Sequence, residues 1–276
     1  MLRGGTAAAH FLRRKVDPVA IHFGPITVRW YGVFIVAGMV LGIFLAGRRG
    51  LKDRLAPEVF HDLLPWIIVG GIVGARLLFV ITYWDQNFSG EPWWHVLAVW
   101  QGGLVFHGGL AGAAAGVVWF ARRRQLPLWV LADALAPSLA LGHVLGRVGC
   151  FINGCCYGLP TGVPWAVHYP LEHETKGLPV HPTQLYEAGL NLLLYAVLEA
   201  LYKRKQFDGQ VFAVYLAAYG VLRGGVEFFR GDYSNLMGGW ITPGHWTSLV
   251  VLAAGIGLWY RLPKVLTRRD APTPAP

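Results

Sequence analysis

The sequence predicts an all-α integral membrane protein with about seven transmembrane helices, and three observations support this class. Of the 276 residues, 54% are hydrophobic and only 14% are charged, whereas a soluble domain carries about 25% charged residues. The mean hydropathy is positive, at +0.43. Seven stretches approach the length of about 20 residues that a membrane-spanning helix needs. The chain is therefore expected to lie within a lipid bilayer.

The predicted spans are mainly apolar, but none is uniformly so. In chain order they are Ile26–Gly47, His61–Tyr83, Val96–Ala121, Leu128–Phe151, Pro182–Leu201, Gln210–Arg230 and Trp240–Tyr260. The many glycines and prolines fit such helices, because neighbouring helices can satisfy the backbone groups that these residues leave free.

Short connections between the spans predict one membrane domain over residues 26–261, with a hairpin-like insertion at 159–180 on the external side. Residues 1–25 form an N-terminal segment whose apolar part is too short for a cleavable signal peptide. Residues 262–276 are expected to form a disordered cytoplasmic tail.

Basic residues in alternate loops predict the orientation. They follow the first, third and fifth spans and fill the tail: Arg48, Arg49, Lys52, Arg54, Arg122, Arg123, Arg124, Lys203, Arg204, Lys205, Arg261, Lys264, Arg268 and Arg269. The loop after the second span, residues 84–94, holds Asp85 and Glu91 and no basic residue. The positive-inside rule then places the C-terminus in the cytoplasm and the N-terminus outside, although Arg13, Arg14 and Lys15 oppose it. This distribution, without interleaved aromatics, also argues against nucleic-acid binding.

Two polar clusters lie near the first and second spans. Arg29 to Gly32 reads Arg-Trp-Tyr-Gly, which suits either an interfacial belt with a snorkelling arginine or a functional site. Gly71 to Arg76 is rich in small residues that permit close helix packing. Arg76 either faces the interior as a functional arginine or pairs structurally with Asp133 or Glu227.

Two further clusters suggest chemistry. His107 precedes Gly108 and Gly109 and serves either as a hydrogen-bonded packing residue or as a group that moves protons near neutral pH. In the sixth span Tyr219, Arg223 and Glu227 are spaced i, i+4, i+8 and share one helical face. An ion pair between Arg223 and Glu227 would allow that helix to insert into the membrane.

The glycine-rich segment Gly146–Gly158 places Arg147 at bilayer depth, where insertion scales set a cost of about 2.5–3.5 kcal/mol for an arginine. Its planar guanidinium suits a carboxylate or a phosphate. The interior charges are Arg76, Arg147 and Arg223 against chiefly Glu227 and Asp133. This surplus of arginine favours an anionic guest, and the commonest one in a membrane is a phospholipid headgroup.

Six motifs in order resemble the prolipoprotein diacylglyceryl transferase family over about Ile21 to Leu252. They are Val28–Gly32, Gly74–Leu77, His107–Leu110, Gly146–Gly158, His181–Glu187 and Tyr219–Arg230. The resemblance implies a bacterial inner-membrane enzyme, active toward the periplasm, that needs no cofactor and no metal. Its partners would be phosphatidylglycerol, which donates its diacylglyceryl group, and a preprolipoprotein, whose lipobox cysteine accepts it as a thioether while glycerol 1-phosphate leaves.

The resemblance also implies roles for single residues. Arg147 matches the arginine that binds the lipid phosphate, Arg223 a second essential arginine, and His107 a histidine for which a base role is proposed. The substrate-binding set implied around them is Tyr31, Arg76, Gly108, Gly109, Asn153, Gly158, Tyr219, Glu227 and Arg230. A base or a positive field is needed because a free thiol is only slightly ionised at neutral pH.

Cys150, Cys155 and Cys156 lie in one short segment on the expected external side, and the first two replace the family's usual asparagine and glutamate. A disulfide from Cys150 to either of the others suits an oxidising compartment, since the adjacent pair would join only under strain. A catalytic cysteine carrying a covalent lipid is an alternative, and palmitoylation or zinc binding are less favoured.

Two other functions would use parts of this pattern. A transporter or binding protein for an anionic lipid would use the same arginines without chemistry, but the sequence lacks the paired broken helices or internal repeat of many transporters. A thiol-redox membrane protein would use the cysteines, but it lacks a Cys-x-x-Cys motif and leaves the arginines unexplained.

Overall fold

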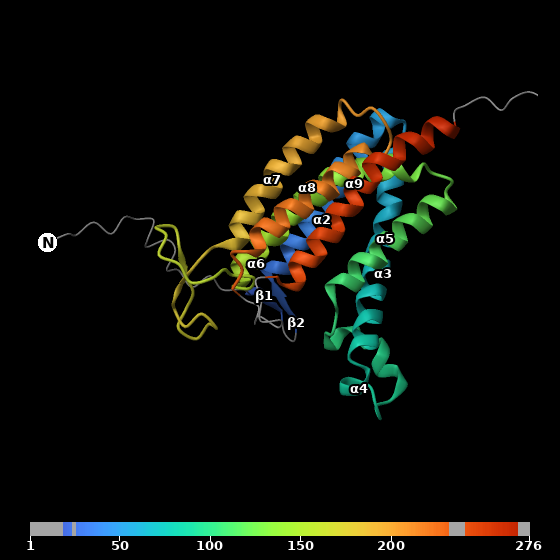
Figure 1. The fold of residues 1–276 in the computed structure, drawn as a ribbon. Coiled ribbons are helices and arrows are strands. Elements are labelled where there is room, and N and C mark those ends of the chain that lie inside the picture. Colours follow the sequence, from blue (N-terminus) through green and yellow to red (C-terminus); the bar gives the residue numbers. More distant parts are fainter. Residues whose placement is uncertain (1–18, 24–25, 232–240, 270–276) are drawn as a thin grey trace, which may run out of the picture. The chain divides into compact units, whose positions relative to one another are not determined.

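The computed structural model describes residues 19–23, 26–231 and 241–269. Within these ranges the protein is mainly helical (Figure 1), so the predicted helical fold class is confirmed. By length and apolar composition, three of the described helical stretches can cross a membrane: Trp30–Asp53, Pro57–Thr82 and Leu128–Asn153. The number of seven spans and their orientation stay predictions.

The helices begin where the sequence supplies a start signal. Helix α3 (Pro57–Thr82) has proline in its first turn and an acidic residue beside it, both favourable at a helix N-terminus. Helix α7 (Thr183–Tyr202) follows Pro182, and α8 (Gln210–Glu227) follows Gly209. Helix α9 (Pro243–Arg269) again starts at a proline. It therefore covers residues 262–269, which the sequence assigns to a disordered tail, while residues 270–276 lie outside the described residues.

Two predicted helix starts are wrong. Ile26–Arg29 forms strand β2, paired antiparallel with β1 (Val19–Phe23), and helix α2 (Trp30–Gly50) begins only after it. Isoleucine, threonine and valine in succession favour an extended backbone. The third span is also too long at its start, because α5 covers only Phe106–Arg123.

The residues before α5 form short helical turns and extended backbone. These turns are α4 (Trp84–Asn87), η2 (Trp93–Leu97) and η3 (Val99–Gln101). Gly102 and Gly103 follow with φ of 88° and 73°. Such angles suit glycine and interrupt a right-handed helix, which explains why α5 cannot begin earlier.

The chain divides into two compact units, of which one comprises residues 43–134. In this unit α3 and α5 pack side by side (Figure 1). The helices approach so closely that a Cβ at Gly74 or at Gly108 would overlap a carbonyl oxygen of the opposite helix. The predicted close packing through small residues of the second span is therefore confirmed.

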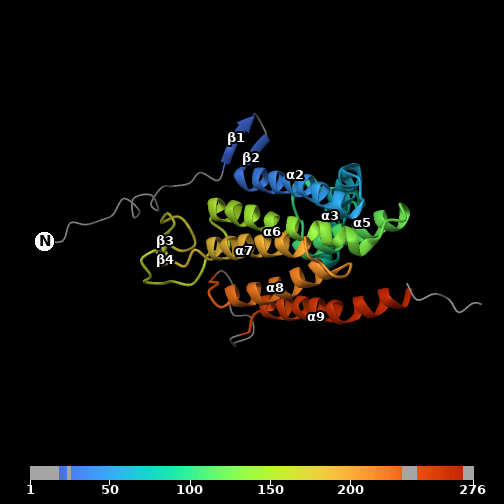
Figure 2. The ribbon, with the colours of Figure 1, turned by 90° about the horizontal axis from the view of Figure 1, so that it is seen from above.

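The other unit comprises residues 1–42 and 135–276. Here α8 lies between α7 and α9 (Figures 1 and 2), and α6 (Leu128–Asn153) runs beside α7 (Figure 2). Between α6 and α7 the insertion forms a small antiparallel pair, β3 (Val167–His168) and β4 (Pro179–Val180).

Polar side chains are buried in this protein while many large apolar side chains are exposed. Among the described residues, Gln184, Glu187, Asn191 and Glu227 are at most 2% exposed. Large apolar residues such as Ile81, by contrast, face outward on the helices. Exposed apolar surface on this scale is unusual for a soluble monomer and fits contact with lipid.

Candidate active site

Arg147 lies near the end of α6, and its side chain is 16% exposed. Its Nη2 atom is 2.9 Å from Oε1 of Glu187, a residue of α7. No N–H of the described residues is aligned on that oxygen, so the pair is held by charge rather than by a directed hydrogen bond. Because removing one partner of a buried pair is costly, Glu187 supplies the counter-charge that Arg147 needs.

Sequence analysis does not assign Glu187 to Arg147, although the sequence contains a signal for it. Glu187 is an acidic residue within the predicted fifth span, and an acid at that depth needs a polar partner. Which arginine it meets depends on the packing of α6 against α7, which the residue pattern does not give.

A second group of polar contacts surrounds Glu227 at the end of α8. Arg223 Nη1 donates to its Oε2 at 2.5 Å, which confirms the predicted ion pair. Thr242 Oγ1 donates to Oε1 at 2.5 Å, and Arg230 Nε is 3.9 Å from Oε2. The backbone of α9 packs directly against the Glu227 carboxylate, since a Cβ at Gly244 would overlap it. Glu227 is thereby fixed between two arginines.

Tyr219 joins the two ion pairs. Its side chain lies within electrostatic reach of Arg147, Glu187 and Arg223. The ring of His143, one turn before Arg147 on α6, meets the Tyr219 ring edge-on with centroids 4.6 Å apart. His143 is a residue of this site that sequence analysis misses, because a single histidine in an apolar helix carries no motif.

Three arginines and two carboxylates of the described residues meet in this cluster. Arg147, Arg223 and Arg230 face the carboxylates of Glu187 and Glu227. Arg147 and Arg223 keep 16% and 12% of their side chains exposed, so each has an accessible edge toward an anion.

Gly158 connects the backbone segments that carry these side chains. Its N–H donates to the carbonyl of His181, and it forms a β-bridge with Arg230. A Cβ at this position would overlap His181 and the carbonyl of Phe229. Only glycine therefore lets the loop after α6, the start of α7 and the end of α8 meet at one point.

Tyr31 and Asn153 lie at the same end of α6. In the first turn of α2, the backbone of Tyr31 packs against Gly149, where a Cβ would be 3.2 Å from the Tyr31 Cα. The Tyr31 side chain is within electrostatic reach of Arg147. Asn153 is the last residue of α6, and its side chain lies within electrostatic reach of Cys155.

Arg76 belongs to the unit of residues 43–134 and binds backbone carbonyls. Its three nitrogen groups donate to the carbonyls of His95, Val96, Gly102 and Gly103 at 2.6–3.2 Å. The guanidinium also lies 5.4 Å from the ring centroids of Phe79 and Phe88. The partners of Arg76 are thus backbone carbonyls, whereas the sequence suggests an ion pair with Asp133 or Glu227. These hydrogen bonds hold the backbone of residues 95–103 in place.

His107, Gly108 and Gly109 are in the first turn of α5, in the same unit as Arg76. Gly108 is buried against α3, whereas His107 is exposed, with its ring 5.8 Å from the Phe106 ring. The expected site residues thus divide between the two units, with His107 and Arg76 in one and the Arg147 cluster in the other.

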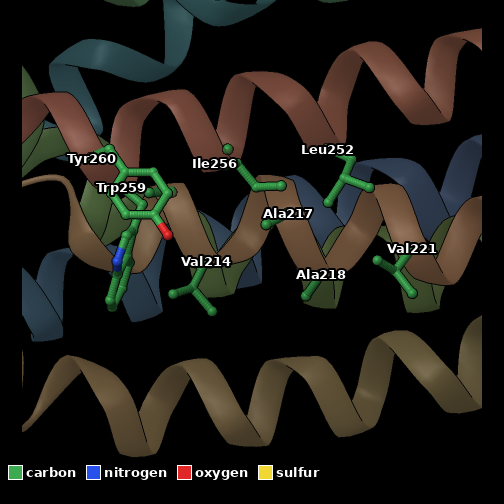
Figure 3. Close-up of a pocket in the computed structure, with 10 residues that line it drawn as sticks. Val214, Ala217, Ala218, Val221, Leu252, Ile256, Trp259 and Tyr260 are labelled. Carbon is green, nitrogen blue, oxygen red and sulfur yellow. The ribbon is translucent and has the colours of Figure 1, made fainter.

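An apolar groove of about 460 Å³ runs between α8 and α9, with Trp259 and Tyr260 at one end (Figure 3). On α8 it is lined by Val214, Ala218 and Val221. With 3.6 residues per turn, this face is opposite the one that carries Tyr219 and its polar neighbours. The groove therefore suits hydrocarbon, and the polar chemistry lies on the other side of α8.

Comparison with known proteins identifies the family of the chain. A family model described as prolipoprotein diacylglyceryl transferase matches residues 18–261. A protein of Gloeobacter violaceus is 37% identical, over 94% of this chain and 96% of its own length. One of Bordetella bronchiseptica is 36% identical, over 89% and 95%, and one of Nitrosomonas europaea is 39% identical, over 89% and 90%. All three are named phosphatidylglycerol–prolipoprotein diacylglyceryl transferase. The chain belongs to the prolipoprotein diacylglyceryl transferase family.

Proposed function

We propose that this chain transfers the diacylglyceryl group of phosphatidylglycerol to the lipobox cysteine of a preprolipoprotein. A bond forms between the cysteine sulfur and a glycerol carbon, and the bond from that carbon to the phosphate oxygen breaks. Glycerol 1-phosphate leaves with the bonding electrons, and the thiol proton passes to a base. The family match and the names of the relatives support this reaction.

The observation that carries the proposal is the pair of arginines near Tyr219, Arg147 and Arg223, each held by a carboxylate and each partly exposed. A departing phosphate gains negative charge in the transition state, and preorganised donors in a site of low dielectric stabilise such charge. Arg147 binds the lipid phosphate, and Arg223 assists as the second arginine. Glu187 and Glu227 hold these guanidinium groups in place before the lipid arrives.

The remaining site residues support this centre in different ways. Tyr31, Asn153, Tyr219 and Arg230 contact the lipid headgroup or its arginines, and Gly158 fixes the loops that carry them. The contacts of Arg76 with carbonyls, and of Gly108 with α3, favour positioning roles in place of direct phosphate binding. His107 is the proposed base for the thiol proton, since histidine is the side chain best suited to proton transfer near neutral pH.

The proposed setting is the bacterial inner membrane, with seven spans, an external N-terminus and a cytoplasmic C-terminus. The basic residues of alternate loops support this orientation. It places the end of α6, with Arg147 and Asn153, and the following loop with Gly158 toward the periplasm, where a lipobox cysteine follows its signal peptide. Both substrates then reach the site from the bilayer.

The test is a transfer assay with purified protein in lipid nanodiscs. Phosphatidylglycerol labelled in its headgroup and a lipobox peptide are expected to yield diacylglyceryl peptide and labelled glycerol phosphate in equal amounts. A peptide with serine in place of the cysteine is the control and should yield neither. Movement of labelled lipid without either product, by folded protein, would contradict the proposal and favour a lipid transporter.

A further inference from the structure

The three cysteines of the chain converge after the end of α6. Cys150 is in the last turn of this helix, and Cys155 and Cys156 are in the loop that follows. Their Sγ atoms all lie within 4.8 Å of one another, and all three are free thiols. The proposed transfer reaction uses none of these sulfurs as nucleophile or base. Their meeting therefore calls for a separate explanation.

The loop that carries two of these sulfurs is held rigidly. Three consecutive carbonyl oxygens accept side-chain hydrogen bonds: Gly154 from His173 at 2.8 Å, Cys155 from Gln184 at 2.7 Å and Cys156 from Thr183 at 2.7 Å. The N–H of Cys155 donates to the carbonyl of Cys150 at 3.2 Å. Neighbours from the insertion and from α7 thus fix the backbone on which the sulfurs are mounted.

The backbone of Cys156 is also strained. Its φ is +64°, a left-handed conformation that is uncommon for residues other than glycine. Such strain persists only where surrounding contacts impose it, and it is concentrated at functional sites. Together with Gly154, at φ +78°, it reverses the chain so that both loop sulfurs lie near Cys150.

Two guanidinium groups, those of Arg147 and Arg230, lie within electrostatic reach of Cys156. Cationic surroundings favour thiolate, which is the form that binds metals. The same two arginines would offset the single negative charge that remains when three thiolates bind one divalent cation.

We infer that Cys150, Cys155 and Cys156 form a binding site for a thiophilic metal ion, of which Zn²⁺ fits the donor set best. Tetrahedral Zn²⁺ with Zn–S distances of about 2.3 Å separates its sulfurs by about 3.8 Å. The present limit of 4.8 Å is then closed by small rotations about the Cα–Cβ bonds. Thiolate ligands select zinc over calcium and magnesium, and the fourth position is left to water or a neighbouring group.

This site goes beyond the proposed transfer reaction, which requires no metal. Binding would join the last turn of α6 to the loop that follows it, a few residues from Arg147 and Gly158. It would also release protons from those cysteines that are still thiols. A bound ion would therefore stabilise the end of α6 and leave the chemistry to the arginines.

Cobalt titration of the reduced, full-length chain in detergent tests the inference. Because the chain has only three cysteines, thiolate-to-cobalt charge-transfer absorption reports on this cluster alone. We expect one Co²⁺ per chain, displaced by Zn²⁺, and a higher unfolding temperature with Zn²⁺. Loss of an outer-shell partner costs about 10–100-fold in metal affinity, so Cys150→Ser, Cys155→Ser or Cys156→Ser should weaken binding at least that much.

Two controls separate the site from other effects. Tyr157→Phe changes the residue beside Cys156 without removing a sulfur and should bind metal like the wild type. The triple cysteine-to-serine variant should lose both the absorption and the thermal shift, even if it still runs as a monodisperse species. Three titratable thiols without cobalt binding would overturn the inference, and so would a persistent disulfide with one free thiol. Neither result would affect the transfer assay, so the two proposals fail separately.

Discussion

At the scale of single residues, the site depends on how buried charges are matched. Arg147 faces Glu187, Arg223 faces Glu227, and Arg76 is satisfied by carbonyls. Arg230 also lies 3.9 Å from the Glu227 carboxylate. An anionic substrate is therefore favoured by the exposed edges of Arg147 and Arg223.

The ion pair of Arg147 and Glu187 gives the first prediction. Glu187→Gln keeps the shape of the side chain but leaves the guanidinium without its counter-charge. Breaking such a buried pair costs about 3–5 kcal/mol, so the unfolding temperature in detergent should fall clearly. Replacing both partners by apolar residues, Arg147→Met with Glu187→Leu, should restore much of the stability while abolishing transfer. A single variant as stable as the wild type would show that the pair contributes little.

The proposed base gives the second prediction. If His107 accepts the thiol proton, the transfer rate of the wild type depends on pH through this proton transfer. His107→Gln keeps a polar side chain of similar reach and should be slower, by about 10²–10⁴-fold, for loss of a general base. Its rate should also lose that pH dependence. An unchanged pH–rate profile would make His107 a packing or orienting residue.

At the scale of elements, glycines allow the close approaches that position the site. Gly158→Ala would push apart the loop after α6, the start of α7 and the end of α8. Overpacking of this kind costs about 1–3 kcal/mol, and a displacement of 1 Å at a reacting centre can cost about 10²-fold in rate. Gly162→Ala, four residues later and with open space around its Cβ, is the matched control and should transfer normally. Equal rates for both variants would contradict the positioning role.

Much of the element pattern could be predicted from the sequence, and the errors have identifiable causes. Hydropathy locates α3 and α6 to within a few residues because their apolar runs are long. It extends the first span into Ile26–Arg29, because an apolar run does not distinguish helix from strand. It also extends the third span through Gly102 and Gly103, although two adjacent glycines are a recognisable breaking signal.

Contacts between residues of different helices are harder to predict from the sequence. Tyr219, Arg223 and Glu227 share a face by simple periodicity, which predicts the ion pair of Arg223 with Glu227. The meeting of Arg147 with Glu187, and of Cys150 with the cysteines five and six residues later, depends on packing and on a left-handed turn. Spacing alone does not determine such contacts.

At the scale of the whole molecule, the orientation in the membrane gives a fourth prediction. A fluorescent protein fused after residue 269 should be fluorescent, because the C-terminus is expected in the cytoplasm. A periplasm-dependent phosphatase inserted in residues 84–94 should be active, since that loop lacks basic residues. The reverse pattern would place the end of α6 on the cytoplasmic side and contradict the proposed access of lipoproteins.

The central claim is that Arg147 binds the phosphate of phosphatidylglycerol during transfer to cysteine. The most direct measurement is the rate of glycerol phosphate release from labelled lipid by wild type, Arg147→Ala and Arg147→Lys in the same nanodiscs. Removal of one hydrogen-bond donor that stabilises charge developing in the transition state lowers the rate about 10²–10³-fold. We therefore expect Arg147→Ala to be nearly inactive and Arg147→Lys to recover little, because lysine lacks the planar fork. Release by Arg147→Ala at the wild-type rate would contradict the assignment.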